Sequence, residues 1–130
     1  MRPELLDKIT ESIHAQKVNL ANMNITDNEI QEVMDKIQQL NPEVSKFNFD
    51  NNKLSDKGAL TLSESLYHFH DVRELSLQFN NVGKEGAIHL FSLKNSFSEL
   101  VIPFHGNKIT NVLEMLEIES LALQKNNYKL

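Results

Sequence analysis

Residues 44–66 read VSKFNFDNNKLSDKGALTLSESL, and residues 72–93 read VRELSLQFNNVGKEGAIHLFSL, which repeats the same pattern. Both segments begin with apolar residues at alternate positions, continue with an asparagine (Asn52 or Asn80) and reach a Gly-Ala pair. The apolar positions that match are Val44 and Val72, Phe47 and Leu75, Phe49 and Leu77, and Leu54 and Val82. The apolar residues at alternate positions predict a short strand. The residues around the Gly-Ala pairs predict a helix packed closely against that strand.

Three further stretches match the same template. Upstream, Val18, Leu20, Met23 and Ile25 take the matching positions. Downstream, the positions are taken by Ile102, Phe104, Asn107 and Ile109, and then by Leu121, Leu123, Asn126 and Tyr128. The first anchors Val18, Phe47, Leu75, Ile102 and Leu121 are 29, 28, 27 and 19 residues apart. The pattern L-x-x-L-x-L-x-x-N-x-L followed by a helical half resembles the leucine-rich repeat, and its length resembles the ribonuclease-inhibitor type.

This resemblance implies an α/β solenoid shaped as a horseshoe arc, with parallel strands on the concave face and helices on the convex face. We predict one domain over residues 1–130, with a capping helix in 1–16 and repeats near 17–43, 44–71, 72–98, 99–117 and 118–130. Repeat four contains Pro103, which removes an amide donor, so we expect a bulge or gap in the sheet there. Repeat five should form a strand with no helix after it.

The asparagines have a structural explanation. After each strand the backbone turns sharply and leaves amide and carbonyl groups without partners, which an inward asparagine side chain can bond. We therefore predict that Asn52, Asn80, Asn107 and Asn126 stack into a ladder across the repeats.

The outward strand residues are the candidate partner-binding residues. Most are polar, but the surface becomes apolar near Phe79, Val101 and Pro103, beside His105. Aromatic side chains among amides are typical anchors of protein interfaces. The predicted binding residues are Asn48, Asp50, Ser76, Gln78, Phe79, Val101, His105 and Gln124. The alternative is that Phe79 folds over the next turn and fills a gap.

Composition excludes several classes of function. The chain has 130 residues, a net charge of −5 and no cysteine. The acidic balance argues against nucleic acid as a partner, and no apolar run is long enough for a membrane span. His68 and His70 lack the further ligands that a closed zinc site needs, and no catalytic or phosphate-binding motif is present. We predict no metal, no cofactor and no enzymatic activity.

The predicted function is non-catalytic protein binding through the concave strand face, with a partner whose identity is unknown. Small size, the missing cysteines and the Asn- and Lys-rich composition are similar to bacterial effector proteins that act in a host cell. The alternative is a structural fragment or subunit that forms a homodimer through an uncapped C-terminal repeat. The N-terminus lacks an apolar signal segment, so we expect a cytoplasmic protein, or export to a host cell without a classical signal peptide.

Overall fold

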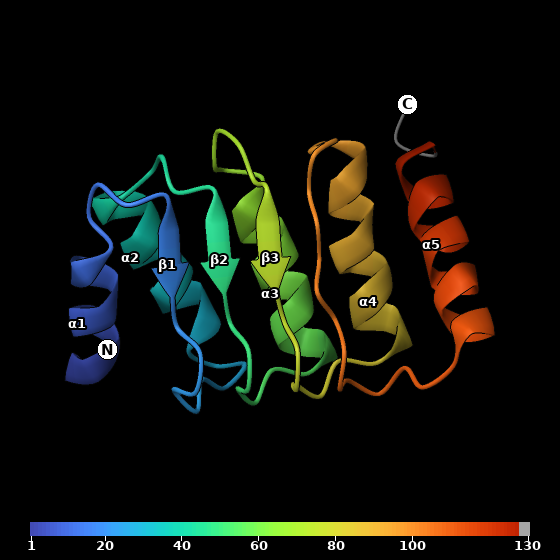
Figure 1. Ribbon diagram of the computed structural model, residues 1–130, viewed down its shortest axis with the longest axis horizontal. Coiled ribbons are helices and arrows are strands. Elements are labelled where there is room, and N and C mark those ends of the chain that lie inside the picture. The colour runs from blue at the N-terminus through green and yellow to red at the C-terminus, as the bar shows by residue number, and fades with distance from the viewer. Residues whose placement is uncertain (128–130) are drawn as a thin grey trace.

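Three short parallel strands form one layer of the molecule, and each comes from a separate sequence repeat. The strands are β1 (Lys17–Asn19), β2 (Lys46–Asn48) and β3 (Glu74–Ser76), in the order β1-β2-β3. Their register places Val18 opposite Phe47 and Phe47 opposite Leu75, so positions matched in the sequence are neighbours in the sheet. The computed structural model, which describes residues 1–127, shows the three strands side by side (Figure 1).

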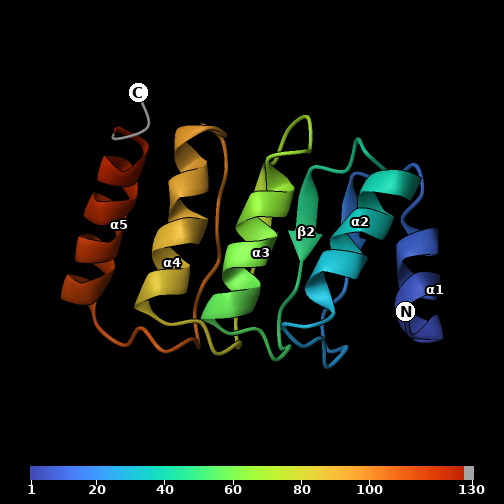
Figure 2. The ribbon, with the colours of Figure 1, turned by 180° about the vertical axis from the view of Figure 1, so that it is seen from behind.

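Helices cover one face of the sheet (Figure 2). They are α2 (Ile30–Leu40), α3 (Asp56–Leu66) and α4 (Lys84–Phe91), which continues as the 3-10 helix Ser92–Asn95. The last helix, α5 (Val112–Asn127), packs on α4 and extends this layer beyond the sheet (Figure 2). The N-terminal helix α1 (Pro3–Glu11) packs against α2 and β1 and fully buries Leu5 and Ile9. A helix therefore occupies part of the segment 1–16 in which a capping helix was predicted.

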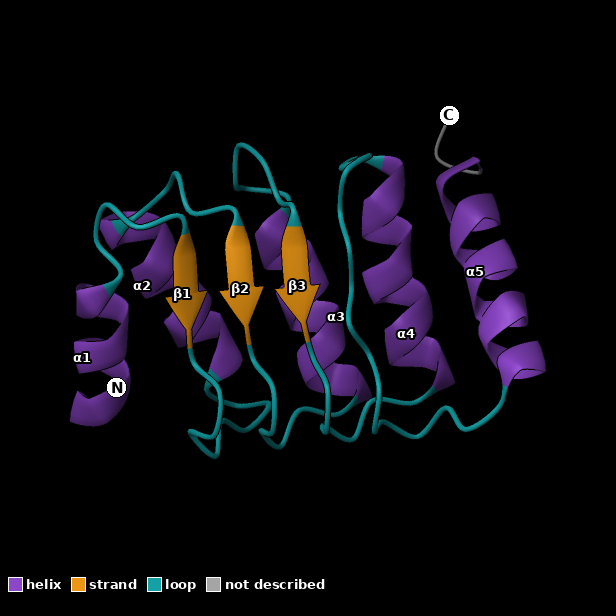
Figure 3. Ribbon diagram, viewed as in Figure 1, coloured by secondary structure: helices purple, strands orange, loops and turns teal. Residues whose placement is uncertain are grey.

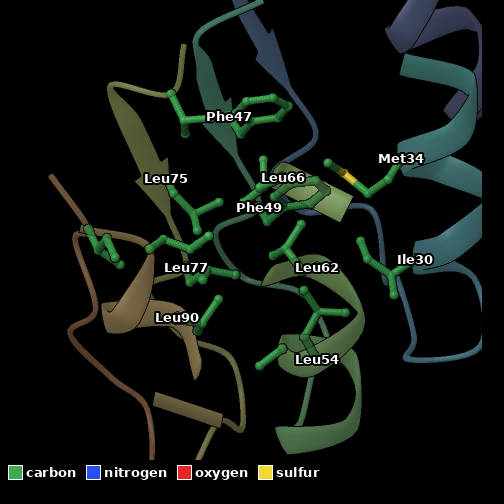
Figure 4. Close-up of a cluster of buried hydrophobic side chains, with 14 of the residues drawn as sticks. Ile30, Met34, Phe47, Phe49, Leu54, Leu62, Leu66, Leu75, Leu77 and Leu90 are labelled. Atoms are coloured by element: carbon green, nitrogen blue, oxygen red, sulfur yellow. The ribbon is translucent and has the colours of Figure 1, made fainter. Parts of the chain in front are cut away.

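The hydrophobic core lies between the two layers. Phe47, Phe49, Leu75 and Leu77 point from the strand layer toward Leu62, Leu66 and Leu90 of the helices (Figure 4). All of these side chains have no exposed surface. The alternating strand residues and the helix residues spaced three or four apart are thus the two halves of one core.

A fourth extended segment continues the sheet beside β3 (Figure 3). We name four rows after the segments that succeed one another in this layer: row one is 17–22, row two 46–51, row three 74–79 and row four 101–106. The carbonyls of Val101, Pro103 and His105 accept bonds from the amides of row three at 2.8 to 3.0 Å. Pro103 has no N–H, so row four pairs with β3 through a single bridge, Glu74 to Val101, and is not a regular strand.

The predicted strand of repeat five is wrong. Residues 112–127 form the single 16-residue helix α5 instead of a short helix followed by a strand. Ile118 and Ala122, four residues apart, are buried on one side of this helix. Leu121 and Leu123 mimic the alternation of a strand, but residues 112–125 contain no Gly, Pro, Asn or Asp to form a turn and are rich in strong helix formers. Tyr128 and the rest of the predicted repeat beyond 127 lie outside the described residues.

The sheet is small and not curled, so the horseshoe arc and its concave face stay predictions. We call the surface formed by the outward side chains of the four rows the strand face. Within residues 1–127, no helix has both the length and the hydrophobicity needed to cross a bilayer.

Candidate protein-binding face

Three asparagines tie consecutive rows together. The side-chain amide of Asn52 donates to the carbonyls of Leu20 and Phe49, both at 2.9 Å, while its oxygen accepts the Ile25 amide at 2.8 Å. Asn80 makes the equivalent bonds to Phe49, Leu77 and Leu54, and Asn107 makes them to Leu77, Phe104 and Val82. Asn126 cannot join this ladder as a strand residue, because its backbone belongs to α5. The ladder is structural and holds the rows in register.

The residue before each ladder position has a left-handed backbone. Its φ angle is 60° at Asn22, 55° at Asn51, 59° at Phe79 and 83° at Gly106. Asparagine and glycine adopt this conformation readily, whereas a bulky side chain such as phenylalanine is an outlier there. The side chains of Asn51 and Asn22 are hydrogen-bonded to each other, and Phe79 interrupts this polar column.

Phe79 lies over the next row and remains exposed. Its ring is perpendicular to the ring of His105, with 5.6 Å between the ring centroids. A Cβ atom at Gly106 would lie only 2.4 Å from the Phe79 ring, so the glycine leaves the space that the ring occupies. The side chain nevertheless keeps 55% of its surface exposed. Phe79 thus packs on the next turn, as the alternative interpretation expected, and still presents an aromatic surface to solvent.

Row four adds further apolar surface on the same side. Val101 is 60% exposed, Pro103 is half-buried and His105 is exposed. Together with Phe79, these residues form what we call the apolar patch. It covers the strand face at rows three and four, where the sequence predicted the change from polar to apolar residues.

Several other predicted binding residues are occupied by contacts inside the protein. Asp50 accepts the Ser76 hydroxyl at 2.6 Å, the Gln78 backbone amide at 2.8 Å and the Gln78 side-chain amide at 3.3 Å. These bonds join rows two and three, and Ser76 is only 6% exposed. Asn48 is half-buried, and its oxygen accepts the Asp50 amide at 2.9 Å. Placing Ser76 on an exposed surface was therefore wrong.

Gln124 does not belong to the strand face. It is exposed on α5, in the helix layer, because the strand predicted for repeat five is a helix. His68 and His70 are both exposed near the end of α3. Among the described residues, no group of three His, Cys, Asp or Glu side chains is placed to hold a metal ion.

Sequence reasoning missed a groove between row four and α5. Its volume is about 740 Å³. Row four contributes Val101, Ile102, Phe104 and His105, and the following segment with α5 contributes Ile109, Thr110, Asn111, Val112, Met115 and Glu119. Phe91 and Lys94 complete the lining. No local pattern could have indicated this groove, since it depends on where α5 packs relative to row four.

Comparison with known proteins shows a likeness of fold. No protein-family model and no curated protein matches the sequence. Solved structures do match, among them one titled Leiomodin-1 Actin-Binding Site 2 (ABS2), with a TM-score of 0.70 and 21% sequence identity. The match covers 91% of this chain and 70% of that chain. It supports a leucine-rich-repeat-like α/β fold.

Proposed function

We propose that this chain is a non-catalytic protein-binding module that contacts its partner through the apolar patch on rows three and four. The observation that carries the proposal is the left-handed backbone of the exposed Phe79. A side chain with a Cβ in this conformation costs about 1–2 kcal/mol relative to the right-handed region. Rows one and two have asparagine at the matching position, Asn22 and Asn51, and asparagine tolerates this conformation better than phenylalanine.

Strain of this kind clusters at functional sites, where an activity compensates for its cost. Phe79 fills no closed part of the core, because 55% of the residue is exposed. Exposed aromatic residues are frequent anchors of protein interfaces. We therefore infer that Phe79 is the anchor, and that Val101 and His105 extend the contact surface.

The class of the partner is supported in a second way. The matching solved structure is titled as an actin-binding site, so a similar fold has a protein as its partner. This supports a protein partner for our chain without naming it. The ribonuclease-inhibitor type, the role as a bacterial effector and the location in a cytoplasm or host cell are proposals supported by the repeat length and composition.

Replacement of Phe79 by asparagine separates binding from stability. We expect Phe79→Asn to raise the melting temperature, because asparagine suits the left-handed backbone, and to abolish capture of a specific protein from a cell lysate. The control is Tyr67→Asn, which removes an aromatic side chain that is 43% exposed but stacks on Phe97 at 6.3 Å, away from the patch. If both variants and the wild type captured the same proteins, the apolar patch would not be the binding site.

A second candidate function is self-association. Val112, Leu113, Leu116 and Leu123 are between 56% and 79% exposed, and all four lie on α5. This concentration of apolar surface on one helix favours a contact with another protein surface, and a second copy of the chain would be the simplest partner.

A further inference from the structure

Row four has backbone groups without hydrogen-bond partners along its outer edge, within the described residues. Val101, Pro103 and His105 turn their carbonyls toward row three. Since consecutive residues of an extended chain direct their backbone groups to opposite sides, Ile102 and Phe104 direct theirs away from row three. Within residues 1–127, no hydrogen bond reaches the amide of Ile102, the carbonyl of Ile102 or the amide of Phe104. Such groups form a template for another strand.

Pro103 does not protect this edge. A proline protects an edge when its missing N–H would have pointed outward. Here the Pro103 carbonyl bonds to the Leu77 amide at 2.9 Å, so the missing N–H belongs to the inner side, toward row three. The carbonyl of Phe104 accepts one side-chain amide, from Asn107 at 3.0 Å, whereas that of Leu77 accepts two, from Asn80 and Asn107. On its outer side, row four therefore lacks a neighbour both for its backbone hydrogen bonds and for the asparagine ladder.

The groove beside this edge suits an apolar and nearly neutral occupant. Apart from His105, its lining carries one cation, Lys94, and one anion, Glu119, which leaves no excess of either sign. The remaining lining residues are aliphatic, aromatic or small polar residues. Complementarity of charge thus favours a segment with little net charge and apolar side chains at every second position, which would point between Phe91 and Met115.

The arrangement of the layers favours a single extended segment over a second folded copy. α5 continues the helix layer beyond row four, and within residues 1–127 no strand lies in front of it (Figure 1). If the row-four edges of two copies paired about a two-fold axis, the two α5 helices would meet in the helix layer before the strands did. One extended peptide has no helix layer and can lie in the space in front of α5.

We propose that the outer edge of row four binds an extended, charge-poor peptide segment of a partner protein as an added strand. The backbone groups of Ile102 and Phe104 pair with the peptide, and the groove takes its alternate apolar side chains. This site goes beyond the apolar patch, since Phe79 does not line the groove. Val101 and His105 lie on both surfaces, so one partner can contact both.

A peptide with the sequence of row three provides the probe. VRELSLQF, residues 72–79 with acetylated and amidated ends and a fluorescent label, has no net charge and carries Leu75 and Leu77 as its inward residues. In the register of the other rows, the amide of Ser76 faces row four and the amide of Leu77 faces away. We expect the full chain to bind this peptide in an anisotropy titration, and N-methylation of the Ser76 amide to weaken binding by about tenfold, with little effect of methylation at Leu77.

Two neighbouring residues provide matched protein variants. Val112 and Leu113 are 74% and 79% exposed, but only Val112 lines the groove. Both stand in the first turn of α5, where glutamate is compatible with a helix. Val112→Glu should weaken peptide binding by about tenfold, whereas Leu113→Glu should change it by less than about twofold. The added-strand proposal would be overturned if methylation at Ser76 and at Leu77 weakened binding equally. It would also be overturned if Val112→Glu bound the peptide as tightly as the wild type. If the wild-type chain forms a dimer, and the peptide binds only after Leu113→Glu has dissociated that dimer, then a second copy of the chain occupies the site instead.

Discussion

At the scale of single residues, the stability of this fold depends on polar side chains that reach from one repeat to the next. A Cβ at Gly58 would lie 2.2 Å from the carboxylate of Asp27, which accepts the Ser55 amide at 2.8 Å. Gly86 has the same relation to Asp56, with a separation of 2.6 Å. The Gly-Ala pairs were predicted to let the helix approach the sheet. These glycines make room for the aspartate of the preceding repeat, and Gly86 also makes room for Val82, whose Cγ1 would lie 2.7 Å from the added Cβ.

The asparagine ladder leads to a prediction about stability. Asn80→Ala should lower the free energy of unfolding by about 1–3 kcal/mol, since it leaves the buried Leu54 amide without its partner and removes one of the two side-chain donors to the carbonyls of Phe49 and Leu77. Asn80 is 5% exposed. The matched control is Asn81→Ala, because Asn81 is the exposed neighbour. Its backbone amide bonds to the Leu54 carbonyl at 2.8 Å, and its side chain makes no hydrogen bond within residues 1–127. Urea denaturation measures the unfolding free energy of both variants. Equal losses of unfolding free energy in Asn80→Ala and Asn81→Ala would contradict the structural role of the ladder.

At the scale of elements, an ion pair joins Arg2, the residue before α1, to Glu29, the residue before α2. The Arg2 guanidinium donates to Glu29 at 2.7 Å through Nε and to the Met23 carbonyl at 2.7 Å through Nη2. Glu29 also accepts the Thr26 amide at 3.1 Å, so its carboxylate closes the turn that precedes α2. The hydrogen bond from Arg2 is the main reason why the pKa of Glu29 lies below its ordinary value of 4.5.

This pKa shift predicts the pH dependence of stability. A carboxylate whose pKa is lower in the folded state stabilises the fold above pH 4.5, and this contribution is lost as the pH falls through the folded-state pKa. The difference in unfolding free energy between wild type and Glu29→Gln should therefore shrink as the pH is lowered from 7 to about 3. It should not exceed about 1 kcal/mol, because the pair is partly exposed. In an Arg2→Ala background the same substitution should show a smaller pH dependence, and an unchanged dependence would exclude the pair as its cause.

At the scale of the whole molecule, the two layers differ in extent. The strand layer stops at row four, while the helix layer continues with α5 (Figure 1). α4 is packed between α3 and α5, whereas α5 buries Ile118 and Ala122 and leaves Leu113, Leu116 and Leu123 exposed. The groove, the open edge of row four and this exposed helix surface all lie on the side of the molecule that faces away from β1.

The oligomeric state distinguishes the proposed function, binding of a partner protein through the apolar patch, from the second candidate function, self-association through α5. We expect light scattering to give the mass of one chain, and Leu123→Lys to leave it unchanged, because an added strand and the apolar patch both need a free surface. Leu60→Lys on α3 is the control, since Leu60 is an apolar residue that is 39% exposed in another helix. A dimer that dissociates on Leu123→Lys but not on Leu60→Lys would favour self-association.

The amino-acid sequence by itself determined the repeating unit of the fold. Val18, Phe47 and Leu75 predicted three strands in register, and Asn52, Asn80 and Asn107 predicted bonds between their turns. These features follow from periods of two and of about 3.6 residues, which are properties of the local chain. The exposed aromatic Phe79 was also identified in the sequence, because its position relative to Asn80 decides which way it points.

Only the tertiary structure decided how residues from different repeats meet. It showed that Ser76 and Gln78 both donate to Asp50, that the Phe79 ring occupies the space over Gly106, and that residues 112–127 form one helix. Leu121 and Leu123 fit a strand locally, while the strong helix formers of residues 112–125 fit a helix, so the local sequence allows both. Packing of Ile118 and Ala122 stabilises the helix, and a local pattern does not include that burial. The groove beside row four has the same origin, since it exists only where α5 and the sheet edge come together.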